Sequence, residues 1–341
     1  MLRRGDTLAA VSLSWGGPAT FPHRYQAGKR QLEEVFGVRV VEMAHTLSSA
    51  EYLQANPQAR AEDLMQAFDD PAINGIVSTI GGDDSIRLIP YIDHDIIRRN
   101  PKVFMGYSDT TVSHLMCLKA GLGTFYGPSI MAGFGENGGI FPYMRDAVWR
   151  MLFSAGSVGE LLPNNEGWTV ELLDWGDPGL QGQKRTITPC TGWRFLQGQG
   201  VHSGHLVGGC IEVLDWLRGT PAWPDEALWD GAVLFLETSE EAPSPQSVKR
   251  ILRAFNATGV LMKINALLFG RPGGQIAPSQ FPDYDQVLRE MIHHEINRPD
   301  LPIITAMDFG HTDPMLVLPY GCRCVIDCDR HTITIPENAV T

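Results

Sequence analysis

The sequence lacks long hydrophobic runs and carries few positive charges. No window approaches the ~18 uninterrupted apolar residues of a membrane-spanning helix, and the early run Leu8–Leu13 is too short for a signal peptide. There are 27 Lys and Arg against 39 Asp and Glu, a formal net charge of −12, and the basic residues form no block. Because nucleic-acid binding relies on neutralising phosphates, a nucleic-acid polymer is not the expected partner. We expect a cytoplasmic protein that acts away from membranes.

Internal repeats, low-complexity tracts and paired metal-binding motifs are also absent. With 43% hydrophobic residues the chain is too apolar to be disordered, and 341 residues suggest two domains. Three of the six cysteines cluster at Cys322, Cys324 and Cys328, but no second Cys/His pair lies at zinc-finger spacing. The alternating pattern around them is typical of strands with small buried thiols. We expect neither a metal ion nor another cofactor.

Short apolar strands alternate with helical segments in the first half of the chain. Strands are expected at Asp6–Ser14, Val38–Glu42, Gly75–Ile80 and Lys102–Tyr107. This alternation predicts an α/β fold with a mainly parallel, doubly wound sheet. Ligands of such sheets bind beyond the carboxyl ends of the strands. Three loops are therefore of interest: Trp15–Thr20, Gly81–Ser85 and Tyr107–Thr111.

The character of the sequence changes between about Ala155 and Cys190. This stretch is rich in Pro, Gly and Asn and has little periodicity, which predicts a linker and an extended loop. Strands then resume at Gly204–Gly209, Ala232–Leu236, Ala266–Phe269 and Pro302–Thr305, with helices between them. We therefore expect a first domain at 1–155, a linker and substrate loop at 156–190, and a second domain at 191–341.

The strongest local signal for chemistry is Gly106-Tyr107-Ser108, where a strand runs into a turn and a helix follows at once. This is the context of a nucleophile elbow, which exposes a serine hydroxyl, although Thr110 replaces the second glycine of the usual motif. The helix N-terminus would supply N–H groups for a developing oxyanion. The alternative is that Ser108 or Asp109 only caps the helix.

A nucleophilic serine needs a base and a group that orients the base. His311 lies in a Pro-, Gly- and Asp-rich loop just past a strand, and Glu237 ends the apolar strand Ala232–Leu236. A carboxylate at the end of a buried strand is costly unless it is paired, whereas the next acids, Glu240 and Glu241, can be solvated. His311 and Glu237 are the candidate base and orienting group; a locally bonded loop histidine and a surface strand end are the alternatives.

Gly81 and Gly82 follow a strand expected beside the one that leads to Ser108. Two glycines permit close approach of a ligand to the backbone, so the Gly82 N–H is a candidate oxyanion donor. An ordinary strand-to-helix turn is the alternative. A phosphate-binding loop is excluded, because its lysine and spacing are absent.

Together these motifs resemble the LD-carboxypeptidase superfamily of serine peptidases (family S66), and within it the microcin C immunity branch. The resemblance implies a flavodoxin-like N-terminal domain joined to a swivelling β/α C-terminal domain, and a homodimer. It implies Ser108 as nucleophile, His311 as base and Glu237 as orienting group, with Gly82 and Asp109 N–H groups as the oxyanion hole. The match is carried by Ser14–Thr20, Ile80–Ser85, Gly106–Asp109, Gly204–Gly209, Leu236–Thr238 and Gly310–Asp313.

The resemblance implies one of two small-molecule substrates. Murein LD-carboxypeptidases release the terminal D-alanine of the peptidoglycan tetrapeptide in the cytoplasm, whereas immunity-type members cut the amide between an aminoacyl group and a modified nucleotide. Pro18-Ala19-Thr20 and the loop Leu173–Asp177 resemble the immunity branch more closely. By this resemblance Trp175 stacks on the nucleobase; packing of the loop onto the domain is the alternative.

Two positions depart from the family pattern near the expected substrate pocket. The run Gly-Gly-Asn-Leu has Cys210 in place of asparagine, and a lysine common in the immunity branch is replaced by Glu241. We expect Asp83, Trp175, Cys210 and Glu241 to contact the substrate. A non-catalytic ligand-binding protein on the same scaffold is an alternative, because a fold does not guarantee chemistry.

Overall fold

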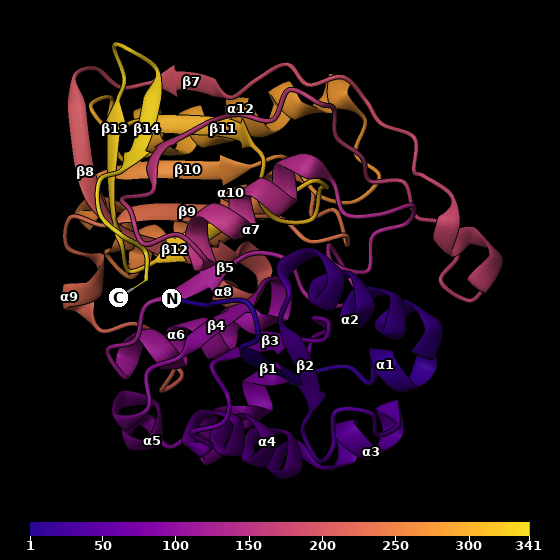
Figure 1. The fold of residues 1–341 in the computed structure, drawn as a ribbon. Helices are drawn as coiled ribbons and strands as arrows, with labels where there is room; N and C mark the ends of the chain where they lie inside the picture. The colour runs from indigo at the N-terminus through magenta and orange to yellow at the C-terminus, as the bar shows by residue number, and fades with distance from the viewer. Residues whose placement is uncertain (341) are drawn as a thin grey trace.

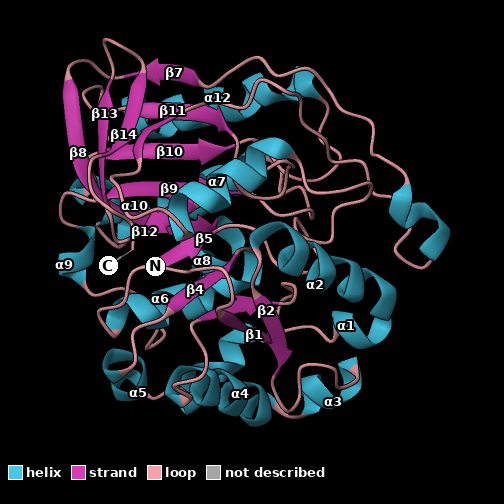
Figure 2. Cartoon of the chain, viewed as in Figure 1, coloured by secondary structure: helices cyan, strands magenta, loops and turns pink. Residues whose placement is uncertain are grey.

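The computed structural model describes residues 1–340, which form two β-sheets covered by helices (Figure 1, Figure 2). The first sheet has the order β12-β5-β4-β3-β1-β2, and its neighbouring strands are parallel except for the antiparallel pair β12 and β5. Its strands are β1 (Thr7–Val11), β2 (Arg39–Glu42), β3 (Gly75–Ser78), β4 (Val103–Gly106), β5 (Thr124–Tyr126) and β12 (Leu318–Tyr320).

The second sheet has the order β6-β14-β13-β8-β9-β10-β11-β7. Strands β8 to β11 are parallel to one another, and the outer strands pair in antiparallel fashion. This α/β architecture confirms the predicted fold class. The strands are β6 (Gly159–Leu161), β7 (Arg194–Gln197), β8 (Val201–Cys210), β9 (Val233–Glu237), β10 (Ala266–Gly270), β11 (Ile303–Met307), β13 (Arg323–Asp327) and β14 (Thr332–Ile335).

Local sequence signals explain where the helices begin and end. Helix α10 starts with Pro245 at its first position, and the Ser244 hydroxyl accepts a hydrogen bond from the Ser247 N–H. Helix α2 ends at Phe36 and is capped by Gly37, whose φ of 70° suits glycine. No helix within residues 1–340 has the length and apolar character needed to cross a bilayer. The helices are α1 (Gly17–Thr20), α2 (Pro22–Phe36), α3 (Ala50–Ala55), α4 (Pro57–Asp69), α5 (His94–Arg99), α6 (Thr111–Lys119), α7 (Pro142–Leu152), α8 (Ile211–Leu217), α9 (Glu226–Trp229), α10 (Pro245–Ala257), α11 (Val260–Lys263) and α12 (Phe281–Arg289).

The segment expected to be a linker and loop has little regular structure. Apart from β6, which joins the second sheet, it contains the short 3-10 turn Pro178–Gly182, which projects at the right of Figure 1. Further along, the chain returns to the first sheet once, through β12, before it completes the second sheet with β13 and β14. Each of the two sheets therefore contains at least one strand from the C-terminal half of the chain.

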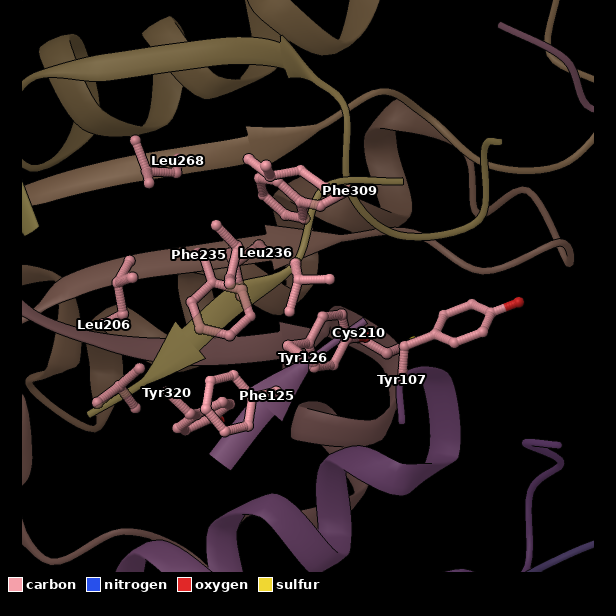
Figure 3. Packing of buried hydrophobic residues seen from close by; sticks show 14 of the residues in the cluster. Tyr107, Phe125, Tyr126, Leu206, Cys210, Phe235, Leu236, Leu268, Phe309 and Tyr320 are labelled. Atoms are coloured by element: carbon pink, nitrogen blue, oxygen red, sulfur yellow. The ribbon is translucent and has the colours of Figure 1, made fainter. Parts of the chain in front are cut away.

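An aromatic cluster packs the two sheets together (Figure 3). Phe235 of β9 lies at its centre, with ring centroids 5.3 Å from Tyr126, 5.2 Å from Tyr320 and 5.9 Å from Phe309. Tyr126 belongs to the first sheet, so these contacts tie the carboxyl ends of β5 and β9 to each other. Edge-to-face pairs of this kind contribute about 0.5–1.5 kcal/mol each beyond area burial. The packing sets the relative position of side chains that emerge from the two sheets.

Candidate active site

Ser108 lies on a sharp turn between β4 and the helical segment that leads into α6. Its φ of 62° is in the left-handed region, which is strained for a residue with a side chain. Neighbouring glycines allow the turn to pack closely. A Cβ on Gly106 would lie 2.4 Å from the Ser78 Oγ, and one on Gly81 would lie 2.9 Å from the Ser108 Oγ. The strand–turn–helix context predicted around Ser108 is present.

Ser108, His311 and Glu237 form a continuous chain of hydrogen bonds across the two sheets. His311 Nε2 is 3.0 Å from the Ser108 Oγ, and His311 Nδ1 is 2.7 Å from Glu237 Oε2. Glu237 is the last residue of β9 and is fully buried. Gly310 leaves room for its carboxylate, because a Cβ there would lie 2.6 Å from Glu237 Oε2. The arrangement can move a proton from the serine hydroxyl to a histidine whose ring is held by a carboxylate.

Tyr126, which the sequence analysis did not single out, connects Glu237 to the backbone of Ser108. Its hydroxyl donates to Glu237 Oε1 at 2.5 Å and accepts from the Ser108 N–H at 3.1 Å. Tyr126 ends β5, and β5 runs parallel to β4, so its side chain reaches the same sheet edge as Ser108. That position at the end of a strand was the one available signal for it.

Glu240, for which solvation alone had been a sufficient explanation, also contacts the histidine. Its Oε2 lies 3.0 Å from His311 Nε2, although the carboxylate is 75% exposed. Burial lowers the pKa of His311, but Glu237 and Glu240 outweigh burial and hold this pKa well above its ordinary value. The hydrogen bond to His311 lowers the pKa of Glu240 to about 2. Both carboxylates therefore stabilise the imidazolium form of His311 relative to its neutral form.

The loop after β3 packs directly against the Ser108 turn. The buried Asp109 side chain accepts hydrogen bonds from the N–H groups of Asp84 and Ser85, at 3.0 and 2.8 Å. Gly82 has a φ of 143°, and a Cβ there would lie 2.4 Å from the Ser14 Oγ. Asp109 therefore fixes the loop that presents the Gly82 backbone beside Ser108.

A small pocket opens at Ser108, and it brings together four of the predicted site residues: Gly82, Ser108, Cys210 and Glu241. Cys210 is buried at the end of β8, and its thiol donates to Glu212 at 3.4 Å. Glu241 is exposed. The pocket is also lined by Glu212, Val213, Trp216, Ser239 and Glu240.

Two predicted substrate contacts lie outside this pocket. Asp83 is exposed beside Gly82 without lining the pocket. Trp175 packs against the first half of the chain: its ring lies edge-on to Phe21 at 6.0 Å, and the Arg24 guanidinium lies 4.7 Å from its centroid. In this structure Trp175 thus makes the loop-packing contacts that were its alternative role.

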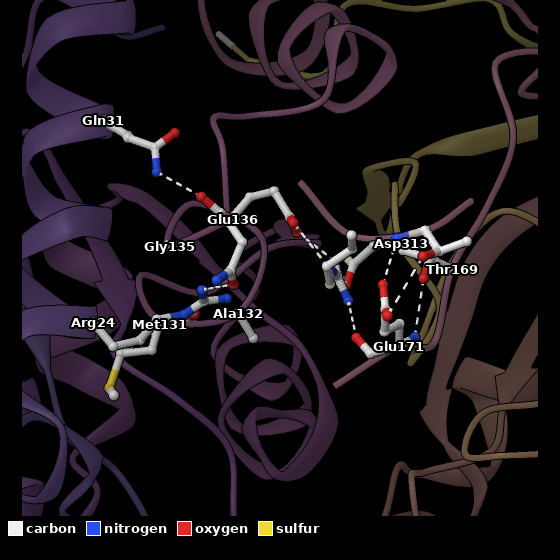
Figure 4. A network of polar contacts seen from close by, with 12 residues as sticks. Arg24, Gln31, Met131, Ala132, Gly135, Glu136, Thr169, Glu171 and Asp313 are labelled. Carbon is white, nitrogen blue, oxygen red and sulfur yellow. Dashed lines mark hydrogen bonds and ion pairs between the residues drawn. The ribbon is translucent and has the colours of Figure 1, made fainter. Parts of the chain in front are cut away.

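A largely buried ion-pair network connects the loop 171–190 to the segment that carries His311 (Figure 4). Arg185 Nε donates to Glu136 Oε1 at 2.8 Å, and its Nη2 donates to Glu136 Oε2 and, at 2.7 Å, to Asp313. Burial lowers the pKa of Arg185, but the two carboxylates outweigh it, so the net shift is upward. Asp313 is two residues from His311. Arg185 therefore braces one end of the histidine loop.

A second buried pair braces the other end of the same loop. Arg271 donates to Asp308 Oδ1 at 2.5 Å, and Asp308 Oδ2 accepts from the Trp193 indole N–H at 2.7 Å and from the Asn164 N–H at 2.9 Å. Removing one partner of such a pair leaves an uncompensated buried charge. His311 is thus held on a loop whose two ends are anchored by charge pairs.

The relatives of this chain are peptidases and immunity proteins. Residues 8–127 match the model of the LD-carboxypeptidase N-terminal domain, and residues 203–326 match that of the C-terminal domain. The microcin C7 self-immunity protein MccF of Escherichia coli is 30% identical, over 98% of this chain and 94% of MccF. The murein tetrapeptide carboxypeptidase of Pseudomonas aeruginosa is 32% identical, over 89% of each chain.

Solved structures agree over the whole chain. An MccF-like protein from Streptococcus pneumoniae in complex with AMP has a TM-score of 0.88 at 31% identity, covering 98% of this chain and 99% of that one. MccF in complex with aspartyl sulfamoyl adenosine has a TM-score of 0.83 at 28% identity, covering 100% and 98%. The family models and relatives confirm the resemblance carried by the sequence motifs: the chain belongs to the LD-carboxypeptidase family of peptidases.

Proposed function

We propose that this chain is a serine hydrolase that cleaves an amide bond with Ser108 as nucleophile, His311 as base and Glu237 as orienting group. The observation that carries the proposal is the hydrogen-bonded series from the Ser108 Oγ through both ring nitrogens of His311 to Glu237, with distances of 3.0 and 2.7 Å. Activation of a serine by a histidine that a third group orients is the general requirement for this chemistry.

In this mechanism His311 Nε2 accepts the Ser108 hydroxyl proton as Oγ attacks the acyl carbonyl carbon. The N–H groups of Gly82 and Asp109 donate to the oxyanion that develops. His311 then protonates the leaving nitrogen, the C–N bond breaks, and an ester to Ser108 remains. Water, deprotonated by His311, attacks the ester carbonyl; the bond to Ser108 Oγ then breaks, His311 returns the proton to Oγ, and the acid is released. Glu237 accepts a hydrogen bond from the His311 Nδ1–H throughout and stabilises the imidazolium.

The proposed substrate is an aminoacyl group joined by an amide to a modified nucleotide. Its support is the pair of structural neighbours that hold AMP and aspartyl sulfamoyl adenosine. A murein tetrapeptide is the second candidate, because the Pseudomonas aeruginosa relative carries that name. Both substrates place the scissile amide next to an amino-acid residue, so the same residues would act on either.

The test is incubation of the purified protein with a panel of aminoacyl sulfamoyl adenosines and with murein tetrapeptide, followed by mass spectrometry of the products. We expect free amino acid and sulfamoyl adenosine. Ser108→Ala should lower kcat by about 10⁴–10⁶ with a thermal midpoint close to wild type. Ser113→Ala, at a buried serine of α6 that has no hydrogen bond to His311, is the matched control.

Undiminished turnover by Ser108→Ala contradicts the mechanism. Binding of both substrate types without cleavage of either would instead favour a ligand-binding protein on this scaffold.

A further inference from the structure

The pocket beside Ser108 has a charged wall made by three glutamates. Glu212, Glu240 and Glu241 all line it, and no lysine or arginine lines it within residues 1–340. Carboxylates grouped on one wall create a negative potential that is focused by a narrow cleft. The charge of this wall therefore favours a cationic group on the ligand.

Two of these carboxylates have no cationic side chain to pair with. Glu240 pairs with His311, but neither Glu212 nor Glu241 forms an ion pair with any lysine or arginine in the described chain. Glu212 Oε1 accepts hydrogen bonds from the Ser239 N–H and hydroxyl, at 3.0 and 2.6 Å. Burial raises the pKa of Glu212 and outweighs these hydrogen bonds, which favour its charged form. A positive charge that enters the pocket would stabilise the ionised form of this desolvated carboxylate.

The same pocket also has an apolar wall, which two side chains of α8 form. Val213 and Trp216 are three residues apart on this helix and both line the pocket, and Trp216 is 41% exposed. An exposed indole can pack against a chain of methylenes and attract a cation near its face. A long side chain with an apolar stem and a positive end matches both walls together.

We propose that this pocket binds a cationic side chain, of the lysyl or arginyl type, on the acyl group next to the scissile amide. The inference rests on the proposed function, since it names the side chain of the same substrate. The stem lies against Val213 and Trp216, and the positive end pairs with the glutamates. An aspartyl or glutamyl side chain meets like charges there, which is how an interface rejects a wrong partner.

The test compares three substrates that differ only in their side chains: lysyl, norleucyl and glutamyl sulfamoyl adenosine. We expect kcat/KM for the lysyl compound to exceed that for the neutral norleucyl compound at least tenfold. The norleucyl compound should exceed the glutamyl compound by a similar factor. Glu241→Lys should reverse the order of the lysyl and glutamyl compounds. Glu34→Lys makes the same charge change at an exposed position of α2, away from the pocket residues, and should keep the wild-type order.

Each outcome has a separate meaning. Cleavage with equal rates, or with a preference for the glutamyl compound, overturns the side-chain inference and leaves the proposed function standing. A reversal that occurs equally in Glu34→Lys shows that overall charge, and not the pocket, sets the preference, and also overturns it. Failure to cleave any of the three overturns the proposed aminoacyl-nucleotide substrate and this inference together, and cleavage of murein tetrapeptide then decides whether the serine hydrolase proposal stands.

Discussion

Replacing Glu240 with glutamine should move the acid limb of the kcat/KM profile toward lower pH. The base must be neutral at Nε2 to accept the serine proton, and the Glu240 carboxylate, 3.0 Å from this nitrogen, favours the protonated imidazolium. The pKa of His311 is held well above its ordinary value by Glu237 and Glu240 against the effect of burial. Removing one of these charges lowers the pKa, so more of the enzyme is active at low pH.

The size of the shift follows from the exposure of Glu240. Two unit charges 4 Å apart interact by about 4 kcal/mol at an effective dielectric of 20. However, the Glu240 carboxylate is 75% exposed, so the range for exposed ion pairs, about 0.2–1 kcal/mol, applies. One pKa unit corresponds to about 1.36 kcal/mol, and the limb should therefore move by roughly 0.1–0.7 pH units. The almost fully buried imidazole of His311 favours the upper part of this range.

The assay measures kcat/KM against pH with a substrate whose side chain is neutral, so that pocket charge does not change binding of the side chain. Glu241→Gln is the matched control, because it removes the same charge from the next residue, which has no ion pair with His311. Because every variant is assayed with the same substrate, titration of the substrate affects all profiles equally and does not contribute to the difference between them. Raising the salt to ~1 M, where the Debye length is about 3 Å, should move the wild-type limb more than that of Glu240→Gln. An unchanged limb in Glu240→Gln, or an equal shift in the control, refutes the reasoning.

Three further variants test the supports of the site. Tyr126→Phe should destabilise the fold by about 1–3 kcal/mol in urea denaturation and lower kcat, because it removes the hydroxyl that donates to Glu237; unchanged stability and kcat contradict that role. Arg185→Met should cost about 3–5 kcal/mol in the same measurement, because it leaves two carboxylates unpaired, and a loss below 1 kcal/mol argues against the brace. Trp175→Ala should raise KM for nucleotide-bearing substrates much more than for murein tetrapeptide in steady-state kinetics, because only the former have a base on which the ring can stack. Equal losses on both would mean that the ring only packs the loop.

Much of the local structure was already determined by the sequence. Runs of β-branched and apolar residues bounded by glycine place β3, β4 and β9 to within two residues of their ends, because strand periodicity and turn chemistry are local properties. The same patterns put Ser108, Glu237 and His311 at or just beyond strand ends. Ordered motifs spread over nearly the whole chain were sufficient to predict the family.

Contacts between distant residues were decided by the tertiary structure alone. The bond from Tyr126 to Glu237 spans 111 positions and that from His311 to Ser108 spans 203, so both depend on how the two sheets pack around Phe235. The approach of Glu240 to His311 likewise depends on a side-chain direction that no periodicity contains. Local pattern determines which residues reach a sheet edge, whereas the distances between their side chains are set by the packing of one sheet against the other.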